Sequence, residues 1–125
     1  MGVVVRFAVA SIPPEVLEAK AGHSVQYGRK RPDGSQSALI DLTPEDDLID
    51  WDVLSGSISA LGDRIADMVE SGAISSLAVD VGLPFYVTNA MSAITIPARL
   101  CEAAGRNKIA ITVTFYATSS EEMTS

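Results

Sequence analysis

The sequence predicts an α+β fold: a single, mostly antiparallel sheet of about four to five strands with one long helix and two short helices, in the order β-α-β-α-β-β-α-β. Three observations support this class. The 125 residues are 47% hydrophobic with a mean hydropathy of +0.25, which suits one globular domain. Short β-branched runs alternate with proline-started segments, and one segment repeats apolar residues at helical spacing. We expect one domain over 1–117 and a flexible tail over 118–125.

The first elements are short. The β-branched run at 3–10 predicts a strand with both faces covered. Ser11, followed by two prolines, predicts a capped short helix that ends at Gly22. A polar loop with a Pro-Asp-Gly turn is expected over 23–36, and a strand over 37–42.

The longest periodic pattern predicts an amphipathic helix from about Asp52 to Ser71. Its apolar residues recur every three or four positions, and they are Leu54, Ile58, Leu61, Ile65 and Met68. Before it, the segment 43–46 resembles a capped helix start, with a hydroxyl, a proline and two acids. Gly56 and Gly62 each cost about 1 kcal/mol relative to alanine inside a helix. Either a close approach to another element or a break near the start of the helix would explain them.

Alternation over 77–83 predicts a strand that Pro84 either stops or places at an edge. The segment 85–91 fits either a continuation of that strand or a loop that lines a groove. The remaining elements are a return strand at 94–96, a helix at 97–104 closed by Gly105, and a final alternating strand at 108–116.

Four segments form a further pattern, namely Pro13-Pro14-Glu15, Tyr27-Gly28-Arg29, Ile94-Thr95-Ile96-Pro97 and Val113-Thr114-Phe115-Tyr116. Together with the element order over 3–116, they resemble a family of small bacterial α/β domains of unknown function. The chain departs from the family in the strand after the basic loop, where Leu39 and Ile40 stand in place of a tryptophan. The resemblance implies a small acidic protein of the immunity type, encoded beside a toxin, and it brings no catalytic residues.

Candidate catalytic groups are few. His23 is the one histidine in the sequence, so a single chain offers no two-histidine metal or acid–base site. Cys101, among the small residues of a helix, is expected to be a buried structural thiol. Four aspartates within 46–52 carry the oxygen ligands that Mg²⁺ or Ca²⁺ prefers, but they lack the EF-hand spacing. We therefore expect no metal, no other cofactor, and a binding protein rather than an enzyme.

Charge is distributed unevenly along the chain. Sixteen acidic and nine basic residues give a net charge of −7, which argues against nucleic acid or an anionic membrane as a partner. Residues 41–70 hold nine acidic residues and one basic residue, whereas residues 1–40 hold three acidic residues and five basic residues. The sequence has neither a run of roughly 18 apolar residues nor a signal-peptide pattern, so we expect a cytoplasmic protein.

The acidic segment 43–70 predicts a docking surface for a basic protein, for example a toxin that this chain neutralises as an immunity or inhibitor protein. The residues assigned to this surface are Glu45, Asp46, Asp47, Asp50, Trp51, Asp52, Asp63 and Asp67. Trp51 fits either an interface anchor or the core, since apolar residues flank it.

The alternative is a small metabolite-binding or enzymatic domain. In that hypothesis a basic loop holds an anionic ligand, which Tyr86 or Asn89 orients. The candidate anion-binding residues are Arg29, Lys30 and Arg31. A homodimer formed through an exposed edge of the sheet is a third hypothesis.

Overall fold

The computed structural model describes residues 2–45, 49–86 and 95–118. The elements in chain order are β1 (Gly2–Ala10), α1 (Pro14–Ala21), β2 (Gln26–Lys30), β3 (Ser35–Asp41), α2 (Trp51–Glu70), β4 (Ile74–Tyr86), α3 (Ala98–Arg106) and β5 (Ala110–Thr118). The strands form one sheet in the order β2-β3-β1-β4-β5. The α+β class, the mostly antiparallel sheet and the set of one long and two short helices are confirmed.

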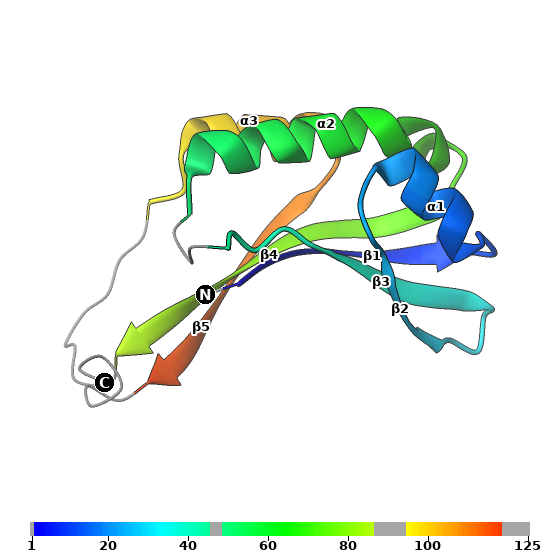
Figure 1. Cartoon of the computed structure of the whole chain (residues 1–125), viewed down its shortest axis with the longest axis horizontal. Coiled ribbons are helices and arrows are strands. Elements are labelled where there is room, and N and C mark those ends of the chain that lie inside the picture. The colour runs from blue at the N-terminus through cyan, green and yellow to red at the C-terminus, as the bar shows by residue number, and fades with distance from the viewer. Residues whose placement is uncertain (1, 46–48, 87–94, 119–125) are drawn as a thin grey trace.

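β1 is the central strand of the sheet. It pairs antiparallel with β3 and with β4, and β2 pairs antiparallel with β3. β5 runs parallel to β4, and α3 provides the crossover that a parallel pair needs. All three helices lie on the same face of the sheet (Figure 1), and none of the described elements covers the other face, which we call the open face.

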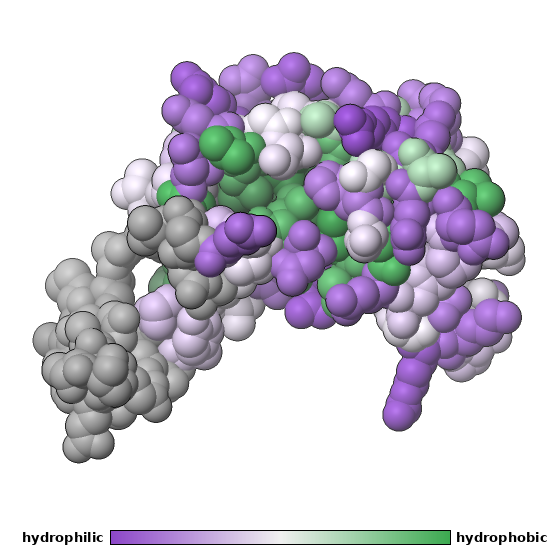
Figure 2. All heavy atoms as spheres, viewed as in Figure 1, coloured by the Kyte–Doolittle hydropathy of each residue, from purple (hydrophilic) through white to green (hydrophobic). Residues whose placement is uncertain are grey.

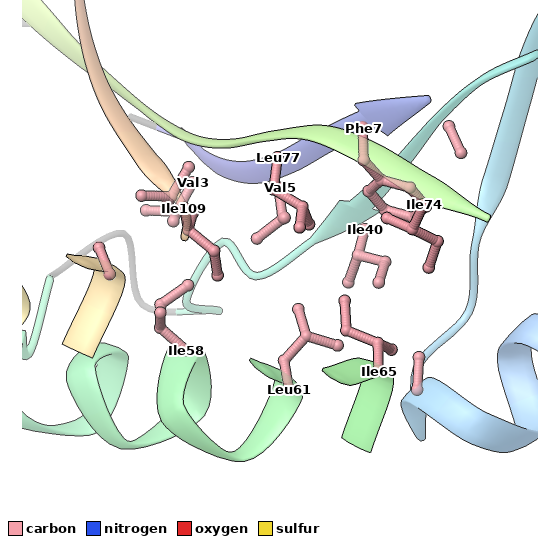
Figure 3. Close-up of a cluster of buried hydrophobic side chains, with 14 of the residues drawn as sticks. Val3, Val5, Phe7, Ile40, Ile58, Leu61, Ile65, Ile74, Leu77 and Ile109 are labelled. Carbon is pink, nitrogen blue, oxygen red and sulfur yellow. The ribbon is translucent and has the colours of Figure 1, made fainter. Parts of the chain in front are cut away.

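The core lies between the sheet and α2 (Figure 3). Ile58, Leu61 and Ile65 of α2 point toward the sheet and are each at most 1% exposed. Full burial of one such side chain stabilises the fold by about 1.5–3 kcal/mol. Met68 packs at the margin of the same cluster. The predicted apolar stripe is therefore confirmed as the face of α2 that holds the helix on the sheet.

β1 has one covered face, so the expectation of two covered faces is wrong. Val3 and Val5 are at most 1% exposed, whereas Val4 between them is half-buried and Arg6 is exposed. A run of valines fits both a strand covered on two faces and a strand covered on one face, because valine also suits the half-exposed surface of a sheet. The charge of Arg6 marks the solvent side.

The start of α1 differs from the prediction. Ser11 does not cap it: the N-cap is Pro13, which makes no side-chain hydrogen bond, and Ser11 has a φ of 53°. The predicted end is confirmed, because Gly22 adopts the left-handed conformation with φ 76° and donates its amide to the Glu18 carbonyl over 2.9 Å.

The cap of α2 also differs from the predicted one. Thr43 does not begin the helix, since its hydroxyl accepts a hydrogen bond from the Val3 amide over 3.0 Å. Asp50 is the N-cap, and its carboxylate accepts from the amides of Asp52 and Val53 over 3.0 and 3.1 Å. The Thr43 hydroxyl satisfies the neighbouring strand and is unavailable to the helix, so an aspartate seven residues later caps α2 instead.

Residues 26–30, expected within a polar loop, form β2. Tyr27 turns toward the helices, and its hydroxyl donates to the Ile12 carbonyl over 2.8 Å. The other four residues of this strand are exposed. An edge strand with one inward side chain has no apolar alternation, which explains why its sequence indicated a loop.

β4 continues through Pro84 to Tyr86. Its pairing with β1 ends at Gly82, so within the described residues Pro84 has β5 alone as a partner. A strand tolerates proline at such a position, and Pro84 therefore marks a local edge. Most of the predicted 85–91 segment, residues 87–91, lies outside the described residues.

Three smaller expectations concern the end of the chain. Residues 95 and 96 lie outside any strand, and residue 94 lies outside the described part, so no return strand is found there. α3 does not end at Gly105 but continues to Arg106, with Asn107 as its C-cap. Thr118 closes β5, and the rest of the predicted tail, 119–125, lies outside the described residues.

No described helix is both long and apolar enough to cross a membrane.

Gly62 lies where α2 meets the end of α3. The Asn107 side chain fills this space and donates its Nδ2 to the Ala103 carbonyl over 2.8 Å, and a Cβ on Gly62 would overlap it. Gly56 is exposed, and a Cβ added there would have no neighbouring atom within 4 Å. The close-approach explanation therefore holds for Gly62 and is wrong for Gly56.

We predict opposite effects of alanine at these two glycines on the free energy of unfolding, measured by urea denaturation followed by circular dichroism. Gly56→Ala should raise it by up to about 1 kcal/mol, because an exposed helical position gains helix propensity. Gly62→Ala should lower it by about 1–3 kcal/mol, because Asn107 must leave its position. Effects of the same sign would contradict the packing of α2 against the end of α3.

Candidate functional site

Four of the residues predicted to form an acidic docking surface lie along α2, namely Trp51, Asp52, Asp63 and Asp67, whereas Glu45 and Asp50 precede the helix. Asp52 lies in its first turn and Asp67 in its last, so they are about 22 Å apart along the helix axis. Asp63 lies between them. Asp46 and Asp47 lie outside the described residues.

Several of the described acids already have structural partners. Asp50 caps α2. Asp52 accepts a hydrogen bond from Arg99 Nη1 over 2.9 Å, and Asp67 Oδ2 lies 3.6 Å from Lys20 Nζ. Such exposed ion pairs add little stability, but each one cancels part of the negative field that would attract a basic protein.

The other described residues of the predicted acidic surface differ in exposure. Glu45 and Asp63 are exposed, and no basic residue in the described part of the chain pairs with them. Glu70, the last residue of the acidic 43–70 segment, has the same properties. Trp51 is half-buried and packs against the core. Hydrophilic residues nevertheless cover the outer side of the helix layer (Figure 2).

The predicted anion-binding run is divided between two sides of the sheet. Arg31 lines a hollow on the open face, Lys30 lines a hollow on the helix side, and Arg29 lines neither. Neighbouring side chains of a strand point to opposite faces, so three consecutive basic residues cannot grip one ligand together. Asn89 and the side chain of Tyr86 lie outside the described residues.

The helix-side hollow, of about 490 Å³, offers few unused polar groups. Its Tyr27 hydroxyl donates to the Ile12 carbonyl. Burial, followed by the negative charges of Glu15 and Glu18, raises the pKa of Tyr27 above its usual value. Lys30 is the one charged residue in the lining.

The open-face hollow, of about 430 Å³, gathers polar side chains from several strands. Its polar lining side chains are those of Arg6, Gln26, Arg31, Ser37 and Ser76. Arg6 of β1 lies opposite Leu39 of β3, which lies opposite Gln26 of β2. These side chains therefore form one row across three strands, with Leu39 between the two polar ends.

Two irregularities in the sheet border this hollow. The pairing of β1 with β4 shifts between Arg6 and Ala8, and Ser76 in this part of β4 has a φ of 58°. The pairing of β2 with β3 shifts between Tyr27 and Lys30. Bulges redirect side chains and are common beside functional sites, and a left-handed non-glycine residue costs about 1–3 kcal/mol.

Gly28 keeps part of this hollow open. A Cβ at this position would overlap the Ser37 hydroxyl. Gly28 also accepts a hydrogen bond at its carbonyl oxygen from Gln36 Nε2 over 2.7 Å, which ties β2 to β3. A larger residue would close the space in front of Ser37.

Three polar side chains of the open-face hollow are available to a ligand. Within the described part of the chain, the side chains of Gln26, Ser37 and Ser76 make no hydrogen bond. Arg6 forms an ion pair with Asp80, with Nε 3.5 Å from Oδ2, so an anionic ligand would share this guanidinium with the carboxylate. The Asp80 carboxylate also accepts a hydrogen bond of 2.9 Å from the Thr114 hydroxyl.

The turn between β2 and β3 positions Arg31. The Gly34 amide donates to the Arg31 carbonyl over 2.9 Å, and the Arg31 amide donates to the Ser35 carbonyl over 2.7 Å. Asp33 Oδ1 accepts from the Ser35 hydroxyl over 2.7 Å and from the Ser35 amide over 2.9 Å. The predicted Pro-Asp-Gly turn is confirmed, and it fixes the backbone of Arg31 at the rim of the hollow.

Most residues of this site have no local signal in the sequence. Arg6, Gln26, Ser37 and Ser76 come from four strands, and no local motif contains them. One pattern was informative, because Arg6 is the single charged residue within an apolar strand. The register of strand pairing, which a single sequence does not reveal, places Arg6 beside the β2–β3 hairpin.

The expectation that Cys101 is buried is wrong. Its thiol is exposed, because Leu100, Ala103 and Ala104 form the buried face of α3. Among the residues that the structure describes, no three histidine, cysteine, aspartate or glutamate side chains group closely enough to hold a metal ion.

Comparison of the chain with models of protein families, with curated proteins and with solved structures finds no match. The family resemblance of the sequence therefore stays a prediction. The function of the open-face hollow has to be inferred from its own geometry.

We predict that Ser35→Ala raises the pKa of the Asp33 carboxyl, measured by NMR titration. The Ser35 hydroxyl and then the Ser35 amide lower this pKa from its usual value of 3.8, with the charge of Arg31 acting in the same direction. Because the folded pKa is lowered, the carboxylate stabilises the turn above pH 3.8, and this contribution is lost as the pH falls through the folded pKa. Ser37→Ala, on the same hairpin, should leave the Asp33 pKa unchanged; an unchanged value in Ser35→Ala would contradict the turn geometry.

Proposed function

We propose that the chain is a binding domain that holds a small anion, a carboxylate or a phosphate, in the open-face hollow. One observation carries this proposal: Arg6 and Arg31, far apart in the sequence, line the same hollow with three polar side chains that have no partner in the described part of the chain. Guanidinium groups bind carboxylate and phosphate with paired hydrogen bonds. Gln26 and the serine hydroxyls would complete the donor set.

The charge near the hollow also supports an anionic ligand. Arg29 and Lys30 lie on the same hairpin as Arg31, and Asp33 and Asp80 are the acids close to the two arginines. The net charge of −7 acts over the whole chain, but salt screens charges over about 8 Å at physiological ionic strength. The nearby charges therefore determine which ligand is attracted.

The lining of the hollow supports binding rather than chemistry. Ser37 and Ser76 are its hydroxyl residues besides Tyr27, and the lining contains no histidine or carboxylate. A serine hydroxyl needs an adjacent base to act as a nucleophile. The enzymatic form of the anion hypothesis therefore has less support than simple binding.

Neutralisation of a basic protein at the acidic surface stays a prediction. Glu45, Asp63 and Glu70 are exposed acids that such a partner could contact. Asp52 and Asp67, however, are already paired with basic residues. The acidic residues alone do not identify a partner, because a charged helix face is also the ordinary means of keeping a protein in solution.

We predict that inorganic phosphate and succinate shift the backbone amide NMR signals around the open-face hollow. Arg6→Gln and Arg31→Gln should each weaken binding by about tenfold or more, since a hydrogen bond to a charged group contributes about 1.5–3 kcal/mol. Arg29→Gln removes the same charge from the same hairpin without touching the lining, and it should weaken binding far less.

Two results would contradict this proposal. The first is an equal loss of affinity in Arg29→Gln, which would indicate a general attraction to the hairpin instead of a site. The second is the absence of shifts at the hollow with either probe.

A further inference from the structure

The two edges of the sheet differ in their protection against pairing with another strand. β2 is five residues long, carries Arg29 and Lys30, and pairs irregularly with β3. Short length, charge and bulges are the features by which proteins block a sheet edge. β5 is nine residues long, contains no charged residue and no proline, and pairs with β4 without a register shift. None of the described strands pairs with its outer side.

The β5 edge also exposes apolar surface. On the helix-covered side, Val113 lies opposite Val81 and Phe115 lies opposite Leu83. Val113 is half-buried, whereas Phe115 is 49% exposed and is one of the few large hydrophobic residues on the surface. An unprotected edge with an exposed aromatic side chain is typical of a strand that pairs with another chain.

We infer that β5 pairs antiparallel with β5 of a second copy, around a two-fold axis at Thr114, and joins the two sheets into one. Thr114 is the middle residue of β5, so this register uses the whole strand. Val113 of each copy then lies opposite Phe115 of the other on the helix-covered side, and Thr114 lies opposite its own counterpart on the open face. Side chains that lie directly opposite each other in this way stabilise antiparallel strand pairing.

The absence of charge on β5 favours this edge as the place where a second copy binds. Each chain carries a net charge of −7, which opposes the association of two copies, and contact through an uncharged segment keeps this repulsion lowest. β5 is such a segment, and a strand without charge has nothing with which to select a charged peptide. The antiparallel contact is also self-complementary, as a two-fold interface requires. Added salt should therefore strengthen the dimer by screening the repulsion.

The experiment is sedimentation equilibrium of the full chain across a wide concentration range, with circular dichroism to verify the fold. The mass should rise with concentration from the 13.1 kDa of one chain to twice that value. Phe115→Lys places like charges across the two-fold axis and should return the mass to that of one chain. Val16→Lys replaces a residue on α1 that is equally exposed, at 50% against 49%, and should leave the dimer intact.

Cross-linking tests the register. Directly opposite residues have Cβ atoms about 4.5–5.5 Å apart, close to disulfide geometry, so Thr114→Cys in a Cys101→Ser background should form a linked dimer. Thr112→Cys in the same background should not, because its two copies would be roughly 13 Å apart.

A wild-type chain that stays at the mass of one chain at every concentration would overturn the inference, as would a dimer that Phe115→Lys leaves unchanged. A disulfide at Thr112 with none at Thr114 would overturn the register. The open-face hollow is lined by residues of β1, β2, β3 and β4 and of the β2–β3 turn, and none of its lining residues belongs to β5. Anion binding and dimerisation can therefore fail independently.

Discussion

The alternation of side chains along β1 is the constraint on which the rest of the structure depends. Because β1 is the central strand, its inward valines decide which face of the sheet the helices cover. The same alternation places Arg6 on the opposite face. One strand thus supplies both the floor of the core and a charged group of the candidate site, and a shift of its register by one residue would destroy both.

The open face shows how a two-layer fold can provide a binding site without a cleft between domains. No described helix covers this face, so the hollow owes its shape to the sheet itself, through the bulge near Ser76 and the absence of a side chain at Gly28. Its donors come mainly from strands rather than from flexible loops. Strand backbones hold side chains with little freedom, which suits a site that must be formed before the ligand arrives.

The sequence was sufficient for features that depend on neighbouring residues, and insufficient for those that depend on register. The stripe from Leu54 to Met68 and the left-handed Gly22 follow from local spacing and conformation, and both are confirmed. Ser11 and Thr43 have the properties of helix caps, but backbone conformation and the Val3 amide decide against them. The meeting of Arg6 with the hairpin depends on which strands pair, and that depends on the core as a whole.

The long separation in sequence between β1 and β4 has a consequence for biosynthesis. β1 is made first, yet Gly2 pairs with Gly82 and Val3 with Val81, so one side of the central strand lacks its neighbour until most of the chain has been synthesised. β3 can pair with the other side much earlier. During this interval a valine-rich segment with a free edge is exposed in the nascent chain, and contacts so distant in sequence form slowly. The nascent chain is therefore most exposed to unwanted strand pairing in the interval between the synthesis of β3 and that of β4.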